Sequence, residues 1–200
     1  MPPRPRPRPT PRFRPDRPIK LDPLPEYPEI ILALNLSTAR PPSFHWLLFV
    51  PDYGTTRQQV IPGTKMHALC HLSPGPNGTM IEEWVYDSAK FTLVQSHTLA
   101  AAVVLGRLPP GKTVQDLNAL LAAIPMRVPT IDARREPAFT CRVWTREAVR
   151  RMHDHGYICC PDVDALEEEV WEYGREAARK HDDKTFTIAS LVVAVNSHNV

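Results

Sequence analysis

The chain has 200 residues, 42% of them hydrophobic, which is enough for one domain with a buried core. Its formal net charge of +2 is unevenly distributed, because residues 1–20 carry six Arg and one Lys against one Asp. The remainder is therefore net acidic, at −4. This distribution argues against nucleic-acid binding by the folded part of the chain.

The sequence lacks the features of a secreted or membrane-spanning protein. Its N-terminal end is rich in Pro and Arg and contains no apolar segment of the signal-peptide kind. The longest apolar runs, residues 98–105 and 188–195, are far shorter than the ~20 residues that span a membrane. With four cysteines and no secretory features, we expect free thiols in a reducing compartment, the cytoplasm or the nucleus.

We expect residues 1–28 to form a disordered arm and residues 29–200 to form a single domain. Proline cannot donate to a helix or a sheet, and the Arg-Pro repeats of residues 4–9 favour polyproline II. Residues 12–18 fit the basic-x-x-Pro-x-x-Pro pattern that SH3-type grooves accept. An SH3-type partner, contact with RNA or acidic surfaces, and no partner at all remain open for this N-terminal arm.

The first part of the domain reads as a series of strands. Short apolar or alternating segments are separated by turn residues, which favours an antiparallel sheet. The predicted strands cover residues 29–36, 44–50, 64–72, 81–86, 91–95 and 98–108.

Two of these strands carry a histidine among apolar neighbours, at His45 in residues 44–50 and at His67 in residues 64–69. Side chains alternate across a strand, so His45 shares a face with Leu47 and Phe49, and Trp46 lies on the other face. On the next strand, His67 lies opposite the more apolar face, where it could point into a polar cleft. Polar residues are costly to bury, so both histidines are either satisfied core residues or parts of a site.

The second part of the domain reads as helical. Thr113 caps a predicted helix to about residue 124, and Thr140 caps another that begins at Cys141 and ends near Gly156. A third helix starts at Asp162 or Asp164, and we interpret its acidic run at residues 167–169 as a solvated face. Residues 185–195 are either a strand or a helix, with the β-branched content favouring a strand. The predicted fold class is α+β, an antiparallel sheet packed with helices.

A cysteine at a helix start has the right surroundings for a nucleophile. The free N–H groups and partial positive charge there stabilise a thiolate, and a nearby imidazole can take the proton. A further polar group can orient that imidazole, and the amides can donate to an oxyanion. Cys141, His45 and His67 have the residue types for this scheme, although Cys141 could equally be a small packed core residue.

The His-Trp strand at residues 45–50, the His-Ala strand at residues 65–69 and the later Cys resemble the circularly permuted papain-like fold. That group includes the NlpC/P60 superfamily and its lecithin:retinol acyltransferase-like branch. Residues 45–152 also resemble an uncharacterised group of fungal proteins with the same His-Trp strand, His-Ala strand and Cys-x-x-Trp helix. The sequence departs from the lecithin:retinol acyltransferase-like pattern in two ways. Thr140 stands before the cysteine where that branch has Asn, and the loop between the two histidine strands is longer.

The papain-like resemblance implies a cysteine hydrolase or acyltransferase acting on an amide, peptide or ester carbonyl. In that scheme Cys141 is the nucleophile, His45 the general base and His67 the residue that orients it. Two other functions stay open. The fold could be an inactive binding module, or the protein could act through its basic Pro-rich arm.

The same residue types raise metal binding as a rival use. Two groups are rich in ligand types: His67, Cys70 and His71, and, later in the chain, His153, His155, Cys159 and Cys160. Neither has the paired Cys-x-x-Cys spacing of a structural zinc site, and the first three would not share one strand face. No phosphate loop or Gly-rich dinucleotide turn is present. We therefore expect neither a metal nor a cofactor.

Overall fold

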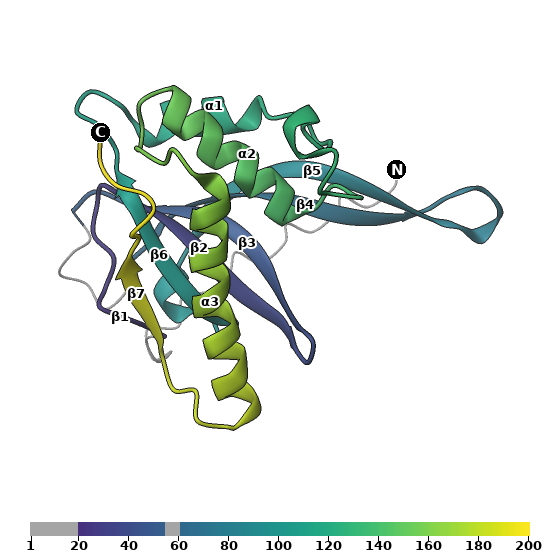
Figure 1. Cartoon of the computed structure of the whole chain (residues 1–200), viewed down its shortest axis with the longest axis horizontal. Coiled ribbons are helices and arrows are strands. Elements are labelled where there is room, and N and C mark those ends of the chain that lie inside the picture. The colour runs from purple at the N-terminus through teal and green to yellow at the C-terminus, as the bar shows by residue number, and fades with distance from the viewer. Residues whose placement is uncertain (1–19, 55–60) are drawn as a thin grey trace, which may run out of the picture.

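The computed structural model describes residues 20–54 and 61–200, which form one seven-stranded sheet with three helices packed on one face (Figure 1). The sheet order is β1-β7-β6-β2-β3-β4-β5. The strands are β1 Leu21–Asp22, β2 Glu29–Ala39, β3 Pro42–Pro51, β4 Gly63–Pro74, β5 Met80–Phe91, β6 Leu99–Arg107 and β7 Ala189–Val193. The helices are α1 Val114–Ala122, α2 Cys141–Asp154 and α3 Val163–Asp182, with short 3-10 turns at Pro76–Gly78, Leu93–Gln95 and Thr130–Asp132.

The helix starts are set by side chains that satisfy free backbone N–H groups. The hydroxyl of Thr140 accepts from the Val143 N–H at α2, as the sequence predicts. Asp162, not Asp164, caps α3 by accepting from the Ala165 N–H. Thr113 starts α1, which ends at Ala122, two residues before the expected position.

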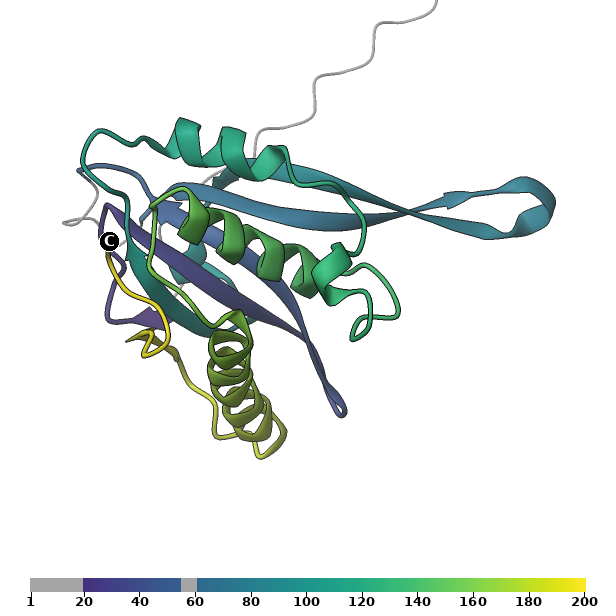
Figure 2. The same cartoon turned by 45° about the horizontal axis from the view of Figure 1, so that its top comes forward.

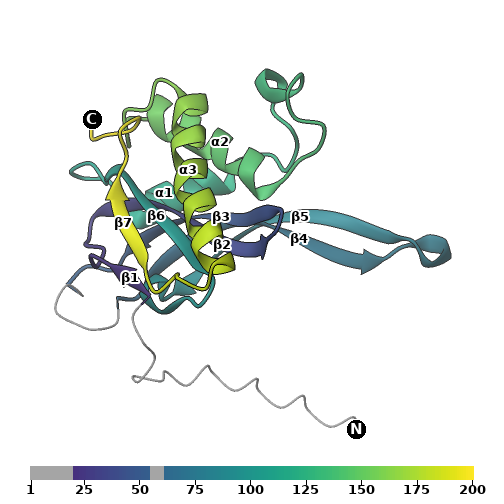
Figure 3. The ribbon, with the colours of Figure 1, turned by 60° about the horizontal axis from the view of Figure 1, so that its bottom comes forward.

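The sheet has a hydrophobic core on each face. On the helical face, alternate residues of β2, β3 and β4 pack with α2 and α3, and this cluster includes Leu34, Trp46, Leu48, Met66, Trp144 and Val170. On the opposite face a smaller cluster includes Leu21, Ile31, Leu47, Phe49, Leu93 and Val94. Figure 3 shows that the three helices all lie on one side of the sheet. The predicted alternation of β3 is therefore confirmed.

The sheet is mixed, and the expectation of a purely antiparallel sheet is wrong. Strands β2 to β6 pair antiparallel, but β7 lies parallel to both β6 and β1. The cause is the connection through α1, α2 and α3, which crosses the helical face and brings the chain back beside β6 in the same direction. The last segment is a strand, as its β-branched residues favour.

Two boundaries in the N-terminal part of the chain also need correction. Leu21 is completely buried and pairs with Ala189, so residues 20–28 belong to the folded domain and not to a disordered arm. The Arg-Pro repeats and the SH3-type pattern lie outside the described residues.

Residues 80–91 form one strand instead of two, and Leu93–Gln95 is a buried 3-10 turn.

The β4–β5 hairpin extends well beyond the body of the molecule (Figures 1 and 2). Its two strands pair over their whole length, from Gly63 with Phe91 to Pro74 with Met80. Leu72, Met80 and Ile81 at its tip are exposed. Among the described residues, no helix has both the length and the apolar composition that crossing a membrane requires.

Candidate functional site

The two predicted histidines meet where the pairing between β3 and β4 stops. These strands pair only from Pro51 with Gly63 to Leu48 with Met66. Beyond that point β4 leaves with β5 as the projecting hairpin (Figure 2). His45 of β3 and His67 of β4 lie just past the last pair, and His45 Nε2 is 2.5 Å from His67 Nδ1. Their rings meet edge to face, with centroids 4.8 Å apart.

The histidine contact continues to a carboxylate on β5. His67 Nε2 lies 3.0 Å from Asp87 Oδ2 and 3.0 Å from the Lys65 ammonium. Lys65 itself forms a 3.2 Å ion pair with Asp87. His67 is buried with only 3% of its surface exposed, so it does not point into an open cleft as the sequence suggests.

His67 Nε2 cannot both donate to Asp87 and accept from Lys65, because an ammonium only donates. With the bond to Asp87 formed, and Lys65 held by its ion pair to the same carboxylate, one arrangement of protons satisfies the contacts from His45 to Asp87. The Asp87 carboxylate only accepts, so His67 carries its proton on Nε2 and donates it there. His67 Nδ1 is then an acceptor, and His45 must donate from Nε2. The tautomer of His45 therefore leaves a lone pair on Nδ1, which has no hydrogen bond within the described part of the chain.

Cys141 approaches the same region from the helical face. It is the first residue of α2 and packs at the margin of the helical-face core. The backbone N–H groups of Trp46, Arg142 and Cys141 itself face the thiol. Trp46 is the residue after His45, so the thiol and the His45 ring flank adjacent positions of β3.

The structure brings His45 and His67 into direct contact but does not join Cys141 to either by a hydrogen bond among the described residues. Strand alternation explains why. Trp46 points to the helical face with Cys141, whereas His45 has the opposite alternation. At this point β3 still pairs with β2, but its opposite edge has no pair with β4.

The electrostatic surroundings keep both the His45 imidazole and the Cys141 thiol neutral. Burial, with smaller contributions from the nearby His67 and Lys65, lowers the pKa of His45 to about 4. Burial raises the pKa of the Cys141 thiol, and the amides of Trp46 and Arg142 oppose this only in part. At pH 7 the pair is therefore a neutral imidazole and a thiol.

The remaining members of the chain of contacts have shifted pKa values as well. Burial lowers the pKa of His67, and its bond to Asp87 offsets this only partly. Burial raises the pKa of Asp87, but hydrogen bonds from His67 and Lys65 outweigh burial and lower it overall. Asp87 is therefore a carboxylate at neutral pH, as the arrangement of protons requires.

Asp87 and Lys65 are not among the residues that the sequence predicts for the site. The turn at residues 74–78 contained the signal, because a hairpin centred on Asn77 places residue 67 opposite residue 87. The prediction of two separate strands after that turn hid this register. Lys65 lies two residues before His67 and so shares its face.

The acidic run of α3 also differs from its sequence-based interpretation. Glu167 is only 5% exposed and binds Arg142 and Arg146, and Glu169 accepts from the backbone of Val195 and Asn196. Glu168 alone is exposed among the three. The interpretation of residues 167–169 as a solvated face is therefore wrong for two of its members.

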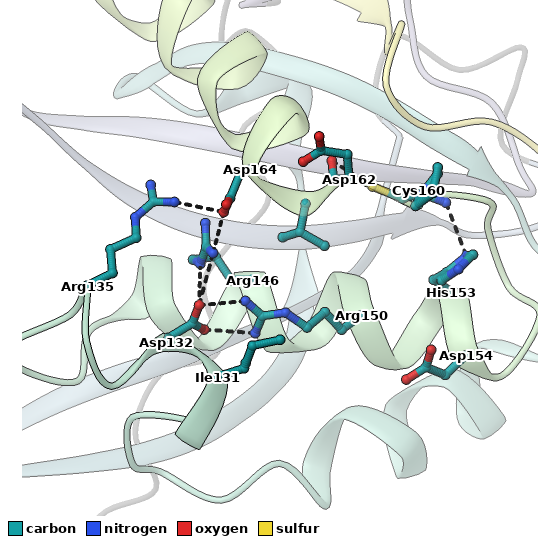
Figure 4. Close-up of a pocket in the computed structure, with 12 residues that line it drawn as sticks. Ile131, Asp132, Arg135, Arg146, Arg150, His153, Asp154, Cys160, Asp162 and Asp164 are labelled. Carbon is teal, nitrogen blue, oxygen red and sulfur yellow. Dashed lines mark hydrogen bonds and ion pairs between the residues drawn. The ribbon is translucent and has the colours of Figure 1, made fainter.

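The Glu167 partners belong to an ion-pair cluster that ties α2, α3 and the 3-10 turn at Thr130–Asp132 together (Figure 4). Arg150 binds both oxygens of the buried Asp132, and Arg146 binds Asp132, Asp164 and Glu167. A cavity of about 600 Å³ opens beside them, also lined by His153 and Cys160. Every arginine in this lining is paired with a carboxylate, so the cluster is a structural clamp.

The rival metal set is dispersed. Cys70 is exposed on the projecting hairpin, whereas His67 is buried. Within residues 20–54 and 61–200, no group of three or more His, Cys, Asp or Glu side chains is arranged to hold a metal ion.

Comparisons with known proteins identify a family but no activity. Neither the curated proteins nor the solved structures contain a match to the chain. A family model matches residues 28–194, which covers the whole sheet except β1 together with all three helices. The chain therefore belongs to DUF6914, a family of unknown function.

Proposed function

We propose that this protein is a cysteine hydrolase or acyltransferase that acts on an amide, peptide or ester carbonyl through an acyl-thioester on Cys141. The observation that carries the proposal is the contact of His45 Nε2 with His67 Nδ1, continued to Asp87. It leaves His45 Nδ1 as an unused base beside the residue whose amide faces the thiol. A papain-like ancestry, inferred from the order of the His, His and Cys motifs, agrees with this assignment.

The reaction begins with proton transfer from the thiol to His45 Nδ1 as sulfur attacks the carbonyl carbon. A C–S bond forms, the carbonyl π electrons move to oxygen, and the amides at the start of α2 and of Trp46 donate to that oxyanion. Collapse expels the amine or alcohol, which takes the proton from His45. A water or a second acceptor then loses its proton to His45 and attacks the thioester carbonyl carbon. The C–S bond breaks, and His45 returns the proton to the Cys141 sulfur.

His67 acts as the positioning residue in this scheme. Its hydrogen bond fixes the His45 tautomer, and Asp87 in turn fixes the tautomer of His67. The same hydrogen bonds stabilise a protonated His45. Its Nε2–H donates to His67, and His67 donates to the negatively charged Asp87, so each bond strengthens the other.

The test uses a p-nitrophenyl ester with the full chain. We expect a burst of p-nitrophenolate and an acyl mass increment on Cys141, and the substitution His45→Ala should lower the burst rate at least about 100-fold. His71→Ala and Cys70→Ser, which change exposed residues of the projecting hairpin, are matched controls and should keep the burst. Equal acylation of wild type and the His45→Ala variant would contradict the proposal.

An inactive papain-like binding module is the second candidate. The raised pKa of Cys141 and the missing hydrogen bond to His45 favour it. It predicts that no ester or amide acylates Cys141, and that Cys141→Ser leaves binding of any captured partner unchanged.

A further inference from the structure

The outer edge of β5 is the most prominent unpartnered feature of the fold. β5 is the last strand of the sheet and has twelve residues, Met80–Phe91. Within the described part of the chain its backbone groups bond only to β4. Edge strands are normally short, or are interrupted by proline or a bulge, because a long open edge pairs with other strands. β5 has neither device, and its charged residues Glu82, Glu83, Asp87 and Lys90, which can also guard an edge, limit the registers in which it can pair.

We propose that β5 pairs antiparallel with β5 of a second copy of this chain, which joins two sheets into one across a two-fold axis at Tyr86. The axis stands perpendicular to the joined sheet, so residues that face each other must lie on the same face. One residue of β5 must therefore face its own copy across the axis. Each possible register is named by that residue, and only a few need to be compared.

Charge selects one of these registers. With the axis at Tyr86, Glu82 of each copy lies opposite Lys90 of the other, and no like charges are opposed. With the axis at Trp84 or Ser88, every charged residue of β5 lies opposite an uncharged one. Those two registers therefore gain nothing from charge.

The two registers next to Tyr86 oppose like charges. With the axis at Val85, Glu83 lies opposite Asp87 twice. With the axis at Asp87, two carboxylates face each other directly. Like charges directly opposite each other destabilise a strand pair, so charge favours the Tyr86 register over both.

The side chains of the selected register are available for pairing. Lys90 is exposed over 70% of its side chain although it also binds Asp52, and Glu82 is exposed. Ile81, an exposed apolar residue, would lie opposite Phe91 of the second copy and lose its contact with water. The apolar tip of each β4–β5 hairpin therefore packs against the end of the other hairpin that lies next to the body of the molecule.

The second copy also contributes to the histidine site. In this register its Val85 lies opposite Asp87, whose side chain is 36% exposed. Val85 would cover the outer side of the His67–Asp87 hydrogen bond and remove water from it. The dimer proposal itself rests on the strand edge and stands whether or not Cys141 is a nucleophile.

Sedimentation velocity of the full chain tests the proposal. We expect a wild-type dimer, and the single substitutions Glu82→Lys and Lys90→Glu should each raise its dissociation constant at least about tenfold, because each creates two like-charge pairs. An equimolar mixture of the two variants should form a heterodimer, since every facing pair then has opposite charges. The double variant should also regain the dimer.

Two controls separate a loss of the β5–β5 contact from a general effect of charge or a loss of folding. Glu83→Lys makes the same charge change at the neighbouring position, which faces Ala89, and should not weaken the dimer. Circular dichroism and melting temperatures should show that each variant is folded. A wild-type monomer at 100 µM (about 100-fold above a micromolar dissociation constant), or a dimer that neither single substitution weakens, would overturn the proposal.

Discussion

At the scale of single residues, the pKa values of His45 and Cys141 are shifted in opposite directions. The pKa of His45 is lowered to about 4 and that of Cys141 is raised, both mainly by burial. A preformed thiolate–imidazolium pair is therefore unfavourable in the resting protein. Under the proposed function, the thiol would therefore give up its proton during attack, as in serine hydrolases, and not in a resting ion pair as in many thiol enzymes.

The first consequence is slow alkylation of Cys141. At pH 7 iodoacetamide should modify Cys141 more slowly than it modifies glutathione, because the buried thiol is protonated. The rate should rise as the pH is raised above 9. Mass spectrometry of the Cys141 peptide measures the rate, and urea-unfolded protein supplies the reference. A rate that is fast at pH 7 and constant above it would contradict the assignment.

The second consequence is acid sensitivity. The pKa of His45 is about 4 when folded and about 6.5 when unfolded, so the unfolded state binds more protons in this range. The stability contributed by the neutral imidazole is complete above pH 6.5 and is lost as the pH falls toward 4, by at most about 3 kcal/mol. Urea unfolding at several pH values measures this loss.

The matched variant for this experiment is His45→Gln, which keeps a polar side chain but does not titrate. Its free energy of unfolding should fall less steeply between pH 6.5 and 4 than that of the wild type. Parallel curves would show that His45 is not the residue responsible.

At the scale of secondary-structure elements, the ion-pair cluster fixes how α2 and α3 cross. Arg146 is 5% exposed and lies among three carboxylates, of which Asp132 and Glu167 are also buried. Removing one partner of such a cluster leaves buried charges uncompensated, so Arg146→Ala should cost about 3–5 kcal/mol in urea unfolding. Arg175→Ala, which removes an exposed arginine of α3, should cost at most about 1 kcal/mol. Similar losses for both variants would contradict a clamp at Arg146.

The elements themselves were largely predictable, because their signals are local. The alternation of β2 to β4 and the caps Thr113 and Thr140 depend on neighbouring residues. The partners of these elements depend on distant ones. The sequence alone could place His45, His67 and Cys141 on a strand, a strand and a helix start. It could not show that β3 and β4 separate just where the histidines lie.

The ion-pair cluster was unpredictable for the same reason. Glu167 has the helical position of a surface residue, but Arg142 and Arg146 of α2, together with Arg135, pair with it in the folded protein. The parallel position of β7 is likewise set by the path of the chain over the helical face, which no local pattern records.

At the scale of the whole molecule, the sheet divides into two halves with different roles. Strands β6 and β2 form the part covered by α3, with side chains in the core on each face, and β7 and β1 complete this half at its edge. Strands β4 and β5 form a projecting hairpin with an open edge. The histidine site lies at the junction of these halves, on β3, so a change in the hairpin position changes the His45–His67 contact directly.

The parallel pairing of β1 with β7 joins the two ends of the described chain, and it has a consequence for biosynthesis. At the usual rate of translation, Leu21 leaves the ribosome about 10–30 s before its partner Ala189 exists. Leu21 has no partner strand throughout that interval, and once β6 has been made, its side that receives β7 is an open edge until β7 follows. Until β7 has been made, the antiparallel part of the sheet, β2 to β6, is exposed to aggregation along this open edge. Its final folding step therefore follows, and cannot accompany, synthesis of the domain.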